Sequence, residues 1–513
     1  MEISQPPSEA PPPADVAASP NSVAPAAEGT DAATKERGPS ADHDRFSFRQ
    51  FLASAVLFAI IVLTLRAVAL EPFGVPTGSM APTLIGNHKE CVCPRCGSPV
   101  VVGAPNAQPG DANGSREAYA NAWCPNCYQG NLHLQQALET AGDRLLVDKS
   151  VFDFRRPRRW EVAVFRNPSD WSKPYVKRVI GLPGETVQIR EGDVYINGEL
   201  ARKSLDQCKA MRIPVFNNDF QPPGDGWKSR WRRGINPSEL PHLARDKSLP
   251  DADEHLDGTA LKWTGGGNDF DWLVYRHWLL DEKREEPIRD LFAYNGGALH
   301  QELNDVHDFI VEFEIEVGVG SGEFALRLYD GQSTVTAEIP VVGRGNPPQG
   351  VKLLGANDAP SSHPWVHFKE QTTHRVEFAF VDRRVMLAID GAEAFDPVDL
   401  KPAINRNAVS RPVWLGCKGV AATVHHFRLF RDVHYSPTGR NGIYDPWPLG
   451  KDEFFMLGDN SANSEDSRYW SIPGIPERNF LGKPLLLHQP SRWGHVGNWE
   501  TQFVDWDRIH WIR

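Results

Sequence analysis

Residues 175–185 read YVKRVIGLPGE, and this stretch decides how the rest of the chain is interpreted. Its β-branched and apolar residues are typical of a strand, and they surround Lys177. A lysine in such surroundings is partly desolvated, and desolvation lowers the pKa of its ammonium group. The neutral amine can then take a proton from a serine hydroxyl. Taken alone, however, Lys177 reads as an ordinary solvated charge on a strand.

A candidate serine partner lies far upstream, in residues 76–84, PTGSMAPTL. The glycine and prolines around Ser79 predict a turn rather than the interior of a helix or strand. Ser-Lys pairs are a known variant of the serine-nucleophile arrangement. Without further context, a serine in this setting would be part of a surface loop.

Further strand patterns supply that context and predict a mainly β fold. A turn leads into a strand at residues 142–149, and a second strand over residues 160–168 is ended by proline. Residues 187–198 alternate like a hairpin and end in Asn-Gly. The last of these segments, residues 454–468, reads FFMLGDNSANSEDSR.

The N-terminal region predicts a disordered tail followed by a membrane anchor. Residues 1–45 are rich in Pro, Ala, Ser and Glu and show no apolar periodicity. Residues 46–70 contain an uncharged, mostly apolar run long enough to cross a bilayer, in preference to a buried globular helix or a cleaved signal. Arg45 and Arg49 precede it, which predicts a cytoplasmic tail and a chain that lies outside the membrane after Leu70. The net charge of −11 argues against nucleic acid as a partner.

These segments, in this order, resemble the bacterial type I signal peptidases, membrane-bound Ser-Lys endopeptidases of exported proteins. The resemblance covers roughly residues 50–90, 142–200 and 445–485. It implies that Ser79 is the nucleophile and Lys177 the general base. It also implies supporting roles: Thr77 and the backbone N–H of Ser79 as oxyanion donors, Ser464 as the group that orients the lysine, and Asp466 with Arg468 as an ion pair behind the site.

The chain departs from the family at one point. Where the family commonly reads GDNRDNS, residues 458–464 read GDNSANS, so Ser461 and Ala462 replace an Arg and an Asp. Loss of both charges together removes a salt bridge without leaving an orphan charge. Lys149, which also follows an apolar run, is the alternative general base.

The first insertion, residues 88–130, carries two Cys-x-x-Cys knuckles that resemble a zinc ribbon. The knuckles are Cys93 with Cys96 and Cys124 with Cys127, and thiolates at this spacing can converge on one ion. Disulfides are the alternative, since an extracytoplasmic location permits them. Cys91 is an extra thiol that could substitute or stay free. A zinc ion here would be structural, because the Ser-Lys chemistry needs no cofactor.

The second insertion, residues 205–440, alternates apolar and polar residues in its later part. Examples are residues 308–316, 374–380 and 424–430, whose spacing predicts a β-sandwich weakly similar to concanavalin-like jelly-roll domains. Such a domain could bind a carbohydrate or a protein, or could serve as an inert spacer. The catalytic domain would then comprise residues 71–204 and 441–513.

We therefore expect a single-pass enzyme of the inner (plasma) membrane, with its N-terminus cytoplasmic and its catalytic domain extracytoplasmic. It would remove signal peptides from exported precursors after small residues at −1 and −3, through an acyl-enzyme. Its partners would be those signal peptides, the lipid bilayer and the protein-export machinery. The alternative is an inactive, membrane-anchored binding or adhesion protein that keeps the peptidase scaffold.

Overall fold

The computed structural model of the chain describes the following residues: 48–104, 119, 122–132, 134–223, 227–233, 258–280, 282–298, 303–356, 362–488, 491–496, 499–504 and 506–512. The chain divides into two units, one up to Ile61 and one from Val62 to Arg513. The predicted tail, residues 1–45, lies outside the described residues. Strands dominate the described part, which confirms the mainly β fold.

Helix α1 (Phe48–Val68) begins the described part of the chain. Apolar side chains such as Leu57, Phe58 and Leu63 are exposed on it. Among the residues the structure describes, no helix is both long enough and apolar enough to cross a bilayer. The anchor predicted for residues 46–70 is therefore not supported by the structure.

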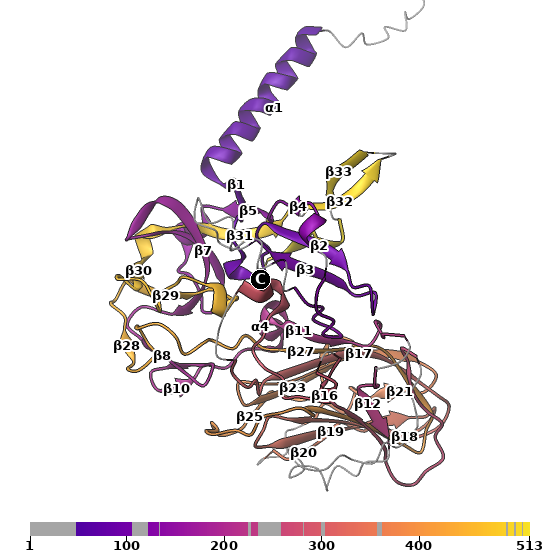
Figure 1. Ribbon diagram of the computed structural model, residues 1–513. Helices are drawn as coiled ribbons and strands as arrows, with labels where there is room; N and C mark the ends of the chain where they lie inside the picture. Colours follow the sequence, from indigo (N-terminus) through magenta and orange to yellow (C-terminus); the bar gives the residue numbers. More distant parts are fainter. Residues whose placement is uncertain are drawn as a thin grey trace, which may run out of the picture. The chain divides into compact units, whose positions relative to one another are not determined.

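One antiparallel sheet contains Lys177, and the turn that contains Ser79 follows the first strand of that sheet (Figure 1). Its strands, in spatial order, are β1 (Leu70–Gly74), β5 (Arg144–Asp148), β31 (Phe480–Leu487), β6 (Val162–Asn167), β7 (Asp170–Gly181), β29 (Glu453–Leu457) and β30 (Gly474–Pro476), with β34 (His510–Trp511) beside β31.

Strand β7 is the centre of this sheet for function. Its second half, from Lys177 to Gly181, is buried, and β6 and β29 pair with its two edges. Lys177 pairs in register with Ala163 of β6, and the next residue, Arg178, pairs with Leu457 at the end of β29. The turn that follows Leu457 is thereby brought beside Lys177.

Two smaller sheets complete the catalytic part. One has the order β10 (Glu199–Leu200), β9 (Asp193–Ile196), β8 (Thr186–Arg190) and β28 (Trp447–Pro448); the other has the order β3 (Pro99–Gly103), β2 (His88–Val92) and β4 (Glu139–Thr140). The short hairpin β32 (Ser491–Val496) and β33 (Trp499–Val504) lies near the C-terminal end of the chain. Positive φ angles at Asn197 and Gly198 form the tight turn between β9 and β10, a turn for which Asn-Gly is well suited.

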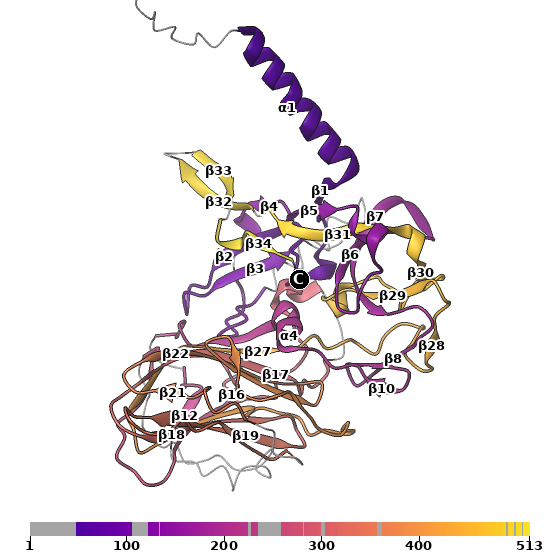
Figure 2. The same cartoon turned by 180° about the vertical axis from the view of Figure 1, so that it is seen from behind.

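The second insertion forms two stacked sheets, which both views show as separate layers (Figures 1 and 2). The first layer is β11 (Ile213–Asn217), β27 (Ala422–Arg431), β17 (Phe309–Val317), β22 (Thr373–Val381), β23 (Arg384–Ile389) and β24 (Ala392–Glu393), with β13 (Leu261–Trp263) and β25 (Val398–Asp399) at its margins. The second layer is β12 (Trp231–Arg233), β14 (Asp271–Tyr275), β26 (Val413–Lys418), β18 (Gly322–Tyr329), β19 (Thr334–Val342) and β20 (Lys352–Leu354), with β21 (Phe368–Lys369) parallel to β19.

A single apolar core fills the space between these layers. Alternate residues of β17, among them Phe309, Val311, Phe313 and Ile315, point into it and are almost fully buried. Alternation of this kind places one face of each strand in the core. Separate cores lie within the catalytic sheets, around residues such as Phe455 and Val164.

A buried ionic junction joins the ends of the second insertion. The insertion begins with helix α4 (Leu205–Met211), which is N-capped by a capping box of Ser204 and Gln207. The Nζ of Lys203 lies 2.7 Å from Asp382 and 2.9 Å from Asp432, so a lysine two residues before α4 meets the aspartate that follows β27. All three side chains of this junction are almost fully buried.

Short helices and one small hairpin make up the remaining elements. They are α3 (Val151–Phe154), η1 (Gly78–Met80), η2 (Leu134–Gln136), η4 (Ala293–Ala298), η5 (Ser461–Asn463), η6 (Glu477–Asn479) and η7 (Trp506–Arg508), together with the pair β15 (Trp278–Leu279) and β16 (Arg284–Glu285).

Candidate active site

Ser79 lies in a compact turn that follows β1. It is the middle residue of η1, and its side chain is buried. Gly142 supports the turn from behind, because a Cβ there would stand 1.9 Å from the carbonyl oxygen of Val75. The turn is thus fixed against the start of β5, and Ser79 is held at one place in the fold.

The structure brings Lys177 to Ser79 across 98 residues of sequence. The lysine Nζ and the serine Oγ are 2.6 Å apart, and both side chains are buried. Burial lowers the pKa of Lys177 from 10.5 to about 8, an effect that the nearby carboxylates of Asp466 and Asp459 oppose in part. A neutral amine in contact with a hydroxyl can activate that hydroxyl for attack on a carbonyl carbon.

Lys149, the alternative base, stands elsewhere. Its Nζ forms an ion pair with Glu71 at 3.3 Å, and one third of its side chain is exposed. The geometry therefore favours Lys177.

The two predicted hydroxyl supports are placed differently. Thr77 precedes η1 and its side chain is exposed, with no hydrogen bond to any described residue. Ser464 is buried close to the dyad, and a Cβ on Gly458 would lie 2.2 Å from its Oγ and 2.5 Å from the carbonyl oxygen of Ser79. The Ser464 Oγ makes no hydrogen bond within the described structure, so the predicted bond to the lysine amine is not formed in this state.

Asp466 and Arg468 form a fully buried, two-pronged ion pair. The guanidinium donates to both carboxylate oxygens at 2.9 Å, and Asp466 also accepts from the backbone N–H of Gly458 at 3.1 Å. Ser461, which stands where the family has arginine, accepts from Arg468 at 2.8 Å. The hydroxyl therefore uses a guanidinium hydrogen that would otherwise lack a partner, and the altered loop stays fully bonded at this point.

A second buried ion pair was given no role in the sequence analysis. Arg178 donates to Asp459 at 2.7 Å and 2.5 Å, and the hydroxyl of Thr83 donates to the same carboxylate at 2.5 Å. Arg178 neighbours the base and Thr83 follows the nucleophile, so this network ties the two segments together. One signal was available: on a strand buried on both faces, a charge next to Lys177 requires a counter-charge.

Asn460 was also overlooked. Its backbone N–H donates to the carbonyl of Ser79 at 3.1 Å, and its side-chain Nδ2 donates to the carbonyl of Gly78 at 3.0 Å. These two bonds hold the backbone of the nucleophile turn. The backbone carbonyl groups of a buried turn need hydrogen-bond donors, and only this general requirement could have suggested the role of Asn460 from the sequence.

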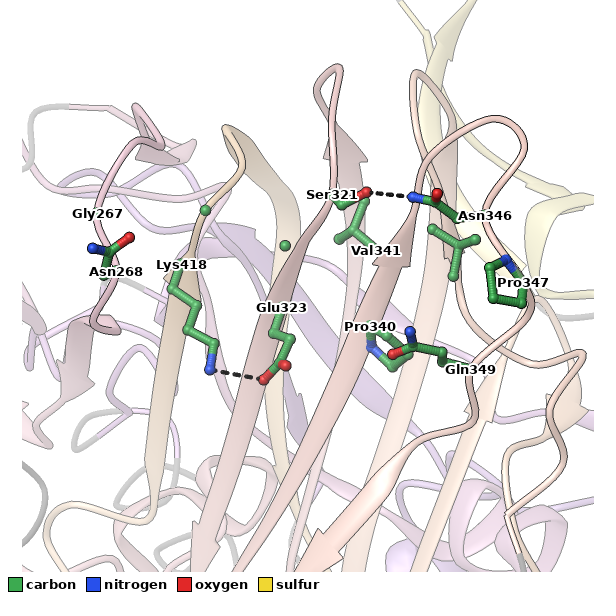
Figure 3. A pocket seen from close by; sticks show the side chains of 13 residues that line it. Gly267, Asn268, Ser321, Glu323, Pro340, Val341, Asn346, Pro347, Gln349 and Lys418 are labelled. Carbon is green, nitrogen blue, oxygen red and sulfur yellow. Dashed lines mark hydrogen bonds and ion pairs between the residues drawn. The ribbon is translucent and has the colours of Figure 1, made fainter.

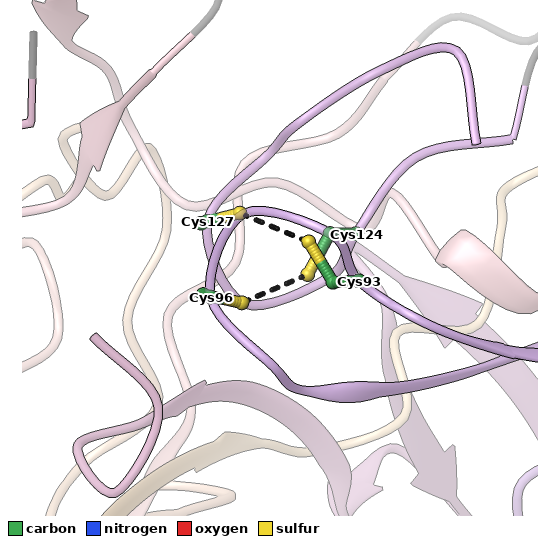
Figure 4. Close-up of side chains that lie close together, drawn as sticks. All are labelled: Cys93, Cys96, Cys124 and Cys127. Atoms are coloured by element: carbon green, nitrogen blue, oxygen red, sulfur yellow. Dashed lines mark hydrogen bonds between the residues drawn. The ribbon is translucent and has the colours of Figure 1, made fainter. Parts of the chain in front are cut away.

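The four predicted cysteine ligands converge (Figure 4). All four are buried, and their sulfurs lie within 4.8 Å of one another. The nearest sulfurs come from different knuckles, at 3.7 Å for Cys93 and Cys127 and 3.6 Å for Cys96 and Cys124. Four thiolates at about 2.3 Å from one tetrahedral zinc ion would stand about 3.8 Å apart, whereas a disulfide requires about 2 Å. The donor set therefore fits zinc, and Cys91 lies outside it.

A separate pocket of about 360 Å³ lies on the second layer of the sandwich (Figure 3). Lys418 and Glu323 form an ion pair of 3.0 Å at its floor, and Asn346 donates to Ser321 at 2.9 Å at its rim. None of the described residues that line it is aromatic, so it offers no ring on which a ligand could stack. It is polar, and it holds none of the dyad residues.

Comparison with known proteins identifies the family of the catalytic part. The family described as signal peptidase, peptidase S26, matches residues 135–250 and 403–488. A signal peptidase I of Pseudomonas aeruginosa is 34% identical over 152 residues, which cover 29% of this chain and 37% of that protein. A probable signal peptidase I-2 of Synechocystis is 42% identical over 80 residues, 14% of this chain and 34% of that protein. The chain thus spans little more than a third of the length of these relatives.

Among solved structures, the carbohydrate-binding module CBM66 of Bacillus subtilis is similar to part of this chain. The alignment covers 33% of this chain and 84% of the module, at 11% identity and a TM-score of 0.21. A likeness this low supports no inference about the sandwich. The S26 match contains Lys177, Ser464, Asp466 and Arg468, while Ser79 precedes its first segment. These matches cover less than half of the chain, and they show that residues 135–250 and 403–488 resemble the signal peptidase family, peptidase S26.

Proposed function

We propose that the chain is a serine endopeptidase that removes N-terminal signal peptides from exported proteins after small residues at −1 and −3. The observation that supports this most directly is the buried contact of 2.6 Å between Lys177 Nζ and Ser79 Oγ. A lysine whose pKa is lowered to about 8 supplies a useful fraction of neutral amine at neutral pH. The likeness of residues 135–250 and 403–488 to signal peptidases supports this substrate class.

In this mechanism Ser79 Oγ attacks the scissile carbonyl while its proton passes to Lys177 Nζ. The resulting oxyanion is bound by the backbone N–H of Ser79 and by the hydroxyl of Thr77, which is exposed and has no bond to break first. Such donors typically contribute about 10²–10³-fold in rate. Lys177 then protonates the leaving amine, and the same lysine activates the water that hydrolyses the acyl-enzyme.

Ser464 is proposed to orient the side-chain nitrogen of Lys177 after the proton of Ser79 has passed to it. Its Oγ is buried beside the dyad and makes no hydrogen bond among the described residues, so it is available to bond the ammonium that forms. Asp466, which opposes the lowering of the lysine pKa, stabilises the same ammonium.

The test is processing of a precursor with an Ala-x-Ala cleavage site. Ser79→Ala and Lys177→Ala should each abolish cleavage, whereas Lys149→Ala, a matched strand lysine already paired with Glu71, should leave it unchanged. Cleavage at the wild-type rate by either dyad variant would refute the dyad. A wild-type chain that binds such precursors without cleaving them would favour the inactive binding protein.

We also propose that the four-cysteine cluster binds a structural zinc ion through Cys93, Cys96, Cys124 and Cys127. The spacing of the sulfurs supports this assignment over disulfides. Zinc would hold the two knuckles together and supply no chemistry to the dyad.

Membrane attachment through residues 46–70, with the N-terminus cytoplasmic and the catalytic part outside, belongs to the same proposal. The apolar composition of this segment supports it. Cell fractionation should place the full chain with the inner membrane, and deletion of residues 1–70 should release it. A carbohydrate or protein ligand of the sandwich stays an expectation, and none of the described residues that line its pocket is aromatic.

A further inference from the structure

Helix η4 of the second insertion contacts the nucleophile turn. Tyr294 of η4 is buried, and its hydroxyl accepts a hydrogen bond from the backbone N–H of Gly86 at 3.1 Å. A Cβ placed on Gly78 would stand 2.3 Å from the Tyr294 ring, and a Cβ on Gly103 would stand equally close. The ring therefore lies between the residue that precedes Ser79 and the end of β3, and both glycines leave space for it.

The neighbouring residue, Asn295, forms a reciprocal amide pair with Asn460. Asn295 Nδ2 donates to Asn460 Oδ1 at 2.9 Å, and Asn460 Nδ2 donates to Asn295 Oδ1 at 2.6 Å. The second hydrogen of Asn460 Nδ2 is donated to the carbonyl of Gly78 at 3.0 Å. Since a carbonyl only accepts, Asn460 must turn its nitrogen toward Gly78, and Asn295 holds it in that orientation.

The carbonyl of Gly78 belongs to the same peptide group as the N–H of Ser79. A peptide group is planar and trans, so its C=O and N–H point in opposite directions. Fixing the Gly78 oxygen from one side, by Asn460 Nδ2 and by the N–H of Ala81 at 3.1 Å, therefore fixes the direction of the Ser79 N–H on the other side. That N–H is the backbone donor of the proposed oxyanion hole.

We propose that Asn295 is a positioning residue of the oxyanion hole, acting through Asn460 and the Gly78–Ser79 peptide. The second insertion would then take part in catalysis by supplying a residue to the nucleophile turn, rather than serve as an inert spacer. This inference rests on the proposed function. It assigns a catalytic consequence to a residue that lies 165 positions from its partner in sequence.

A role of Asn295 in positioning the oxyanion hole predicts a specific change in the kinetic constants. Oxyanion donors act on the transition state and not on bound substrate, so their misplacement lowers kcat and leaves KM unchanged. Loss of the two amide bonds of Asn295 should reduce kcat about tenfold. The pH midpoint of kcat/KM, which reports the base, should not move.

The experiment uses the full chain, a fluorogenic peptide with an Ala-x-Ala site, and active-site titration to correct for misfolded protein. Asn295→Ala should lower kcat about tenfold at constant KM, and should weaken binding of a matching peptide aldehyde, which forms a tetrahedral adduct, by the same factor. Affinity for the cleaved product peptide should not change. Asn295→Asp, which still accepts from Asn460 Nδ2, should recover most of the loss.

Two further variants separate positioning from general stability. In an Asn460→Ala background, Asn295→Ala should have no additional effect, because the chain of bonds is already broken. Asn407→Ala is the control within the insertion, since the Asn407 side chain bonds to the carbonyl of Gly331 and to Tyr329 rather than to the nucleophile turn, and it should behave as wild type. Wild-type kcat in Asn295→Ala, a change in KM alone, or independent effects in the double variant would overturn the inference. Failure of the wild-type chain to cleave would instead refute the proposed function on which it rests.

Discussion

The burial of Lys177 predicts that one substitution will abolish activity and yet strengthen the fold. The structure lowers the pKa of this lysine from 10.5 to about 8 because its ammonium is removed from water. That difference corresponds to about 3 kcal/mol by which the protonated lysine destabilises the folded state. Methionine has a similar length and carries no charge, so Lys177→Met removes this penalty.

The expected gain is smaller than the full penalty, because the bond between Lys177 Nζ and Ser79 Oγ is also lost. One such bond contributes about 1 kcal/mol, which leaves a net stabilisation of about 2 kcal/mol at pH 7. The sign follows from linkage: below pH 8 the lysine is protonated in both folded and unfolded chains, so the penalty is fully present. Above about pH 10.5 it is neutral in both, so the gain from Lys177→Met should vanish and only the loss of the bond, about 1 kcal/mol, should remain.

The assay is hydrogen exchange of the β6 and β7 amides as a function of urea, which reports the free energy of opening of this sheet alone. It should be run at pH 7 and repeated near pH 10, on wild type and on Lys177→Met. Protection that is lower in Lys177→Met at pH 7, or a gain that does not shrink as the pH rises, would refute the reasoning. In parallel, kcat/KM of the wild type should rise about tenfold per pH unit up to pH 8 and then level off.

Two other predictions concern the surroundings of the dyad. Asp459→Asn leaves the guanidinium of Arg178 buried without a counter-charge and should lower the free energy of unfolding in urea by about 3–5 kcal/mol. The control Asp452→Asn changes an exposed carboxylate and should have little effect. Equal effects of the two substitutions would contradict the role given to the buried pair. Metal analysis of the purified chain should find one zinc ion, lost in Cys124→Ser and kept in Cys417→Ser, whereas paired thiols without metal would show the cluster to be disulfides.

The sequence allowed the dyad and the cysteine cluster to be predicted because short motifs carry both. The motif around Ser79, the motif around Lys177 and each Cys-x-x-Cys knuckle are recognisable from residues close together in the chain, and the structure brings the two motifs and the two knuckles together. The alternation of β17 likewise predicted a strand with one buried face. The hydrogen-bond partner of Ser464 could not be predicted from the sequence, because it depends on shifts of a few tenths of an ångström in the positions of the atoms around Gly458.

Contacts between distant segments were the features that the sequence could not predict. Arg178 meets Asp459 across 281 residues and Asn295 meets Asn460 across 165, and neither pair leaves any periodic signal. A strand pattern specifies which face is buried but not which charge lies opposite. The insertion could therefore be recognised as a β-domain, while the contact of its short helix η4 with the nucleophile turn could not be predicted.

The junction of Lys203 with Asp432 has a consequence for how this chain could be shortened and how it could have been assembled. The two backbones are separated by no more than one lysine side chain, one aspartate side chain and the 2.9 Å between them. A linker of about four residues could span that gap. Excision between these points should therefore leave ends that are already neighbours, as is usual where a domain has been inserted into a loop of another. Such a minimal chain would keep Ser79 and Lys177 but lose Asn295, so it is expected to fold readily and to cleave slowly.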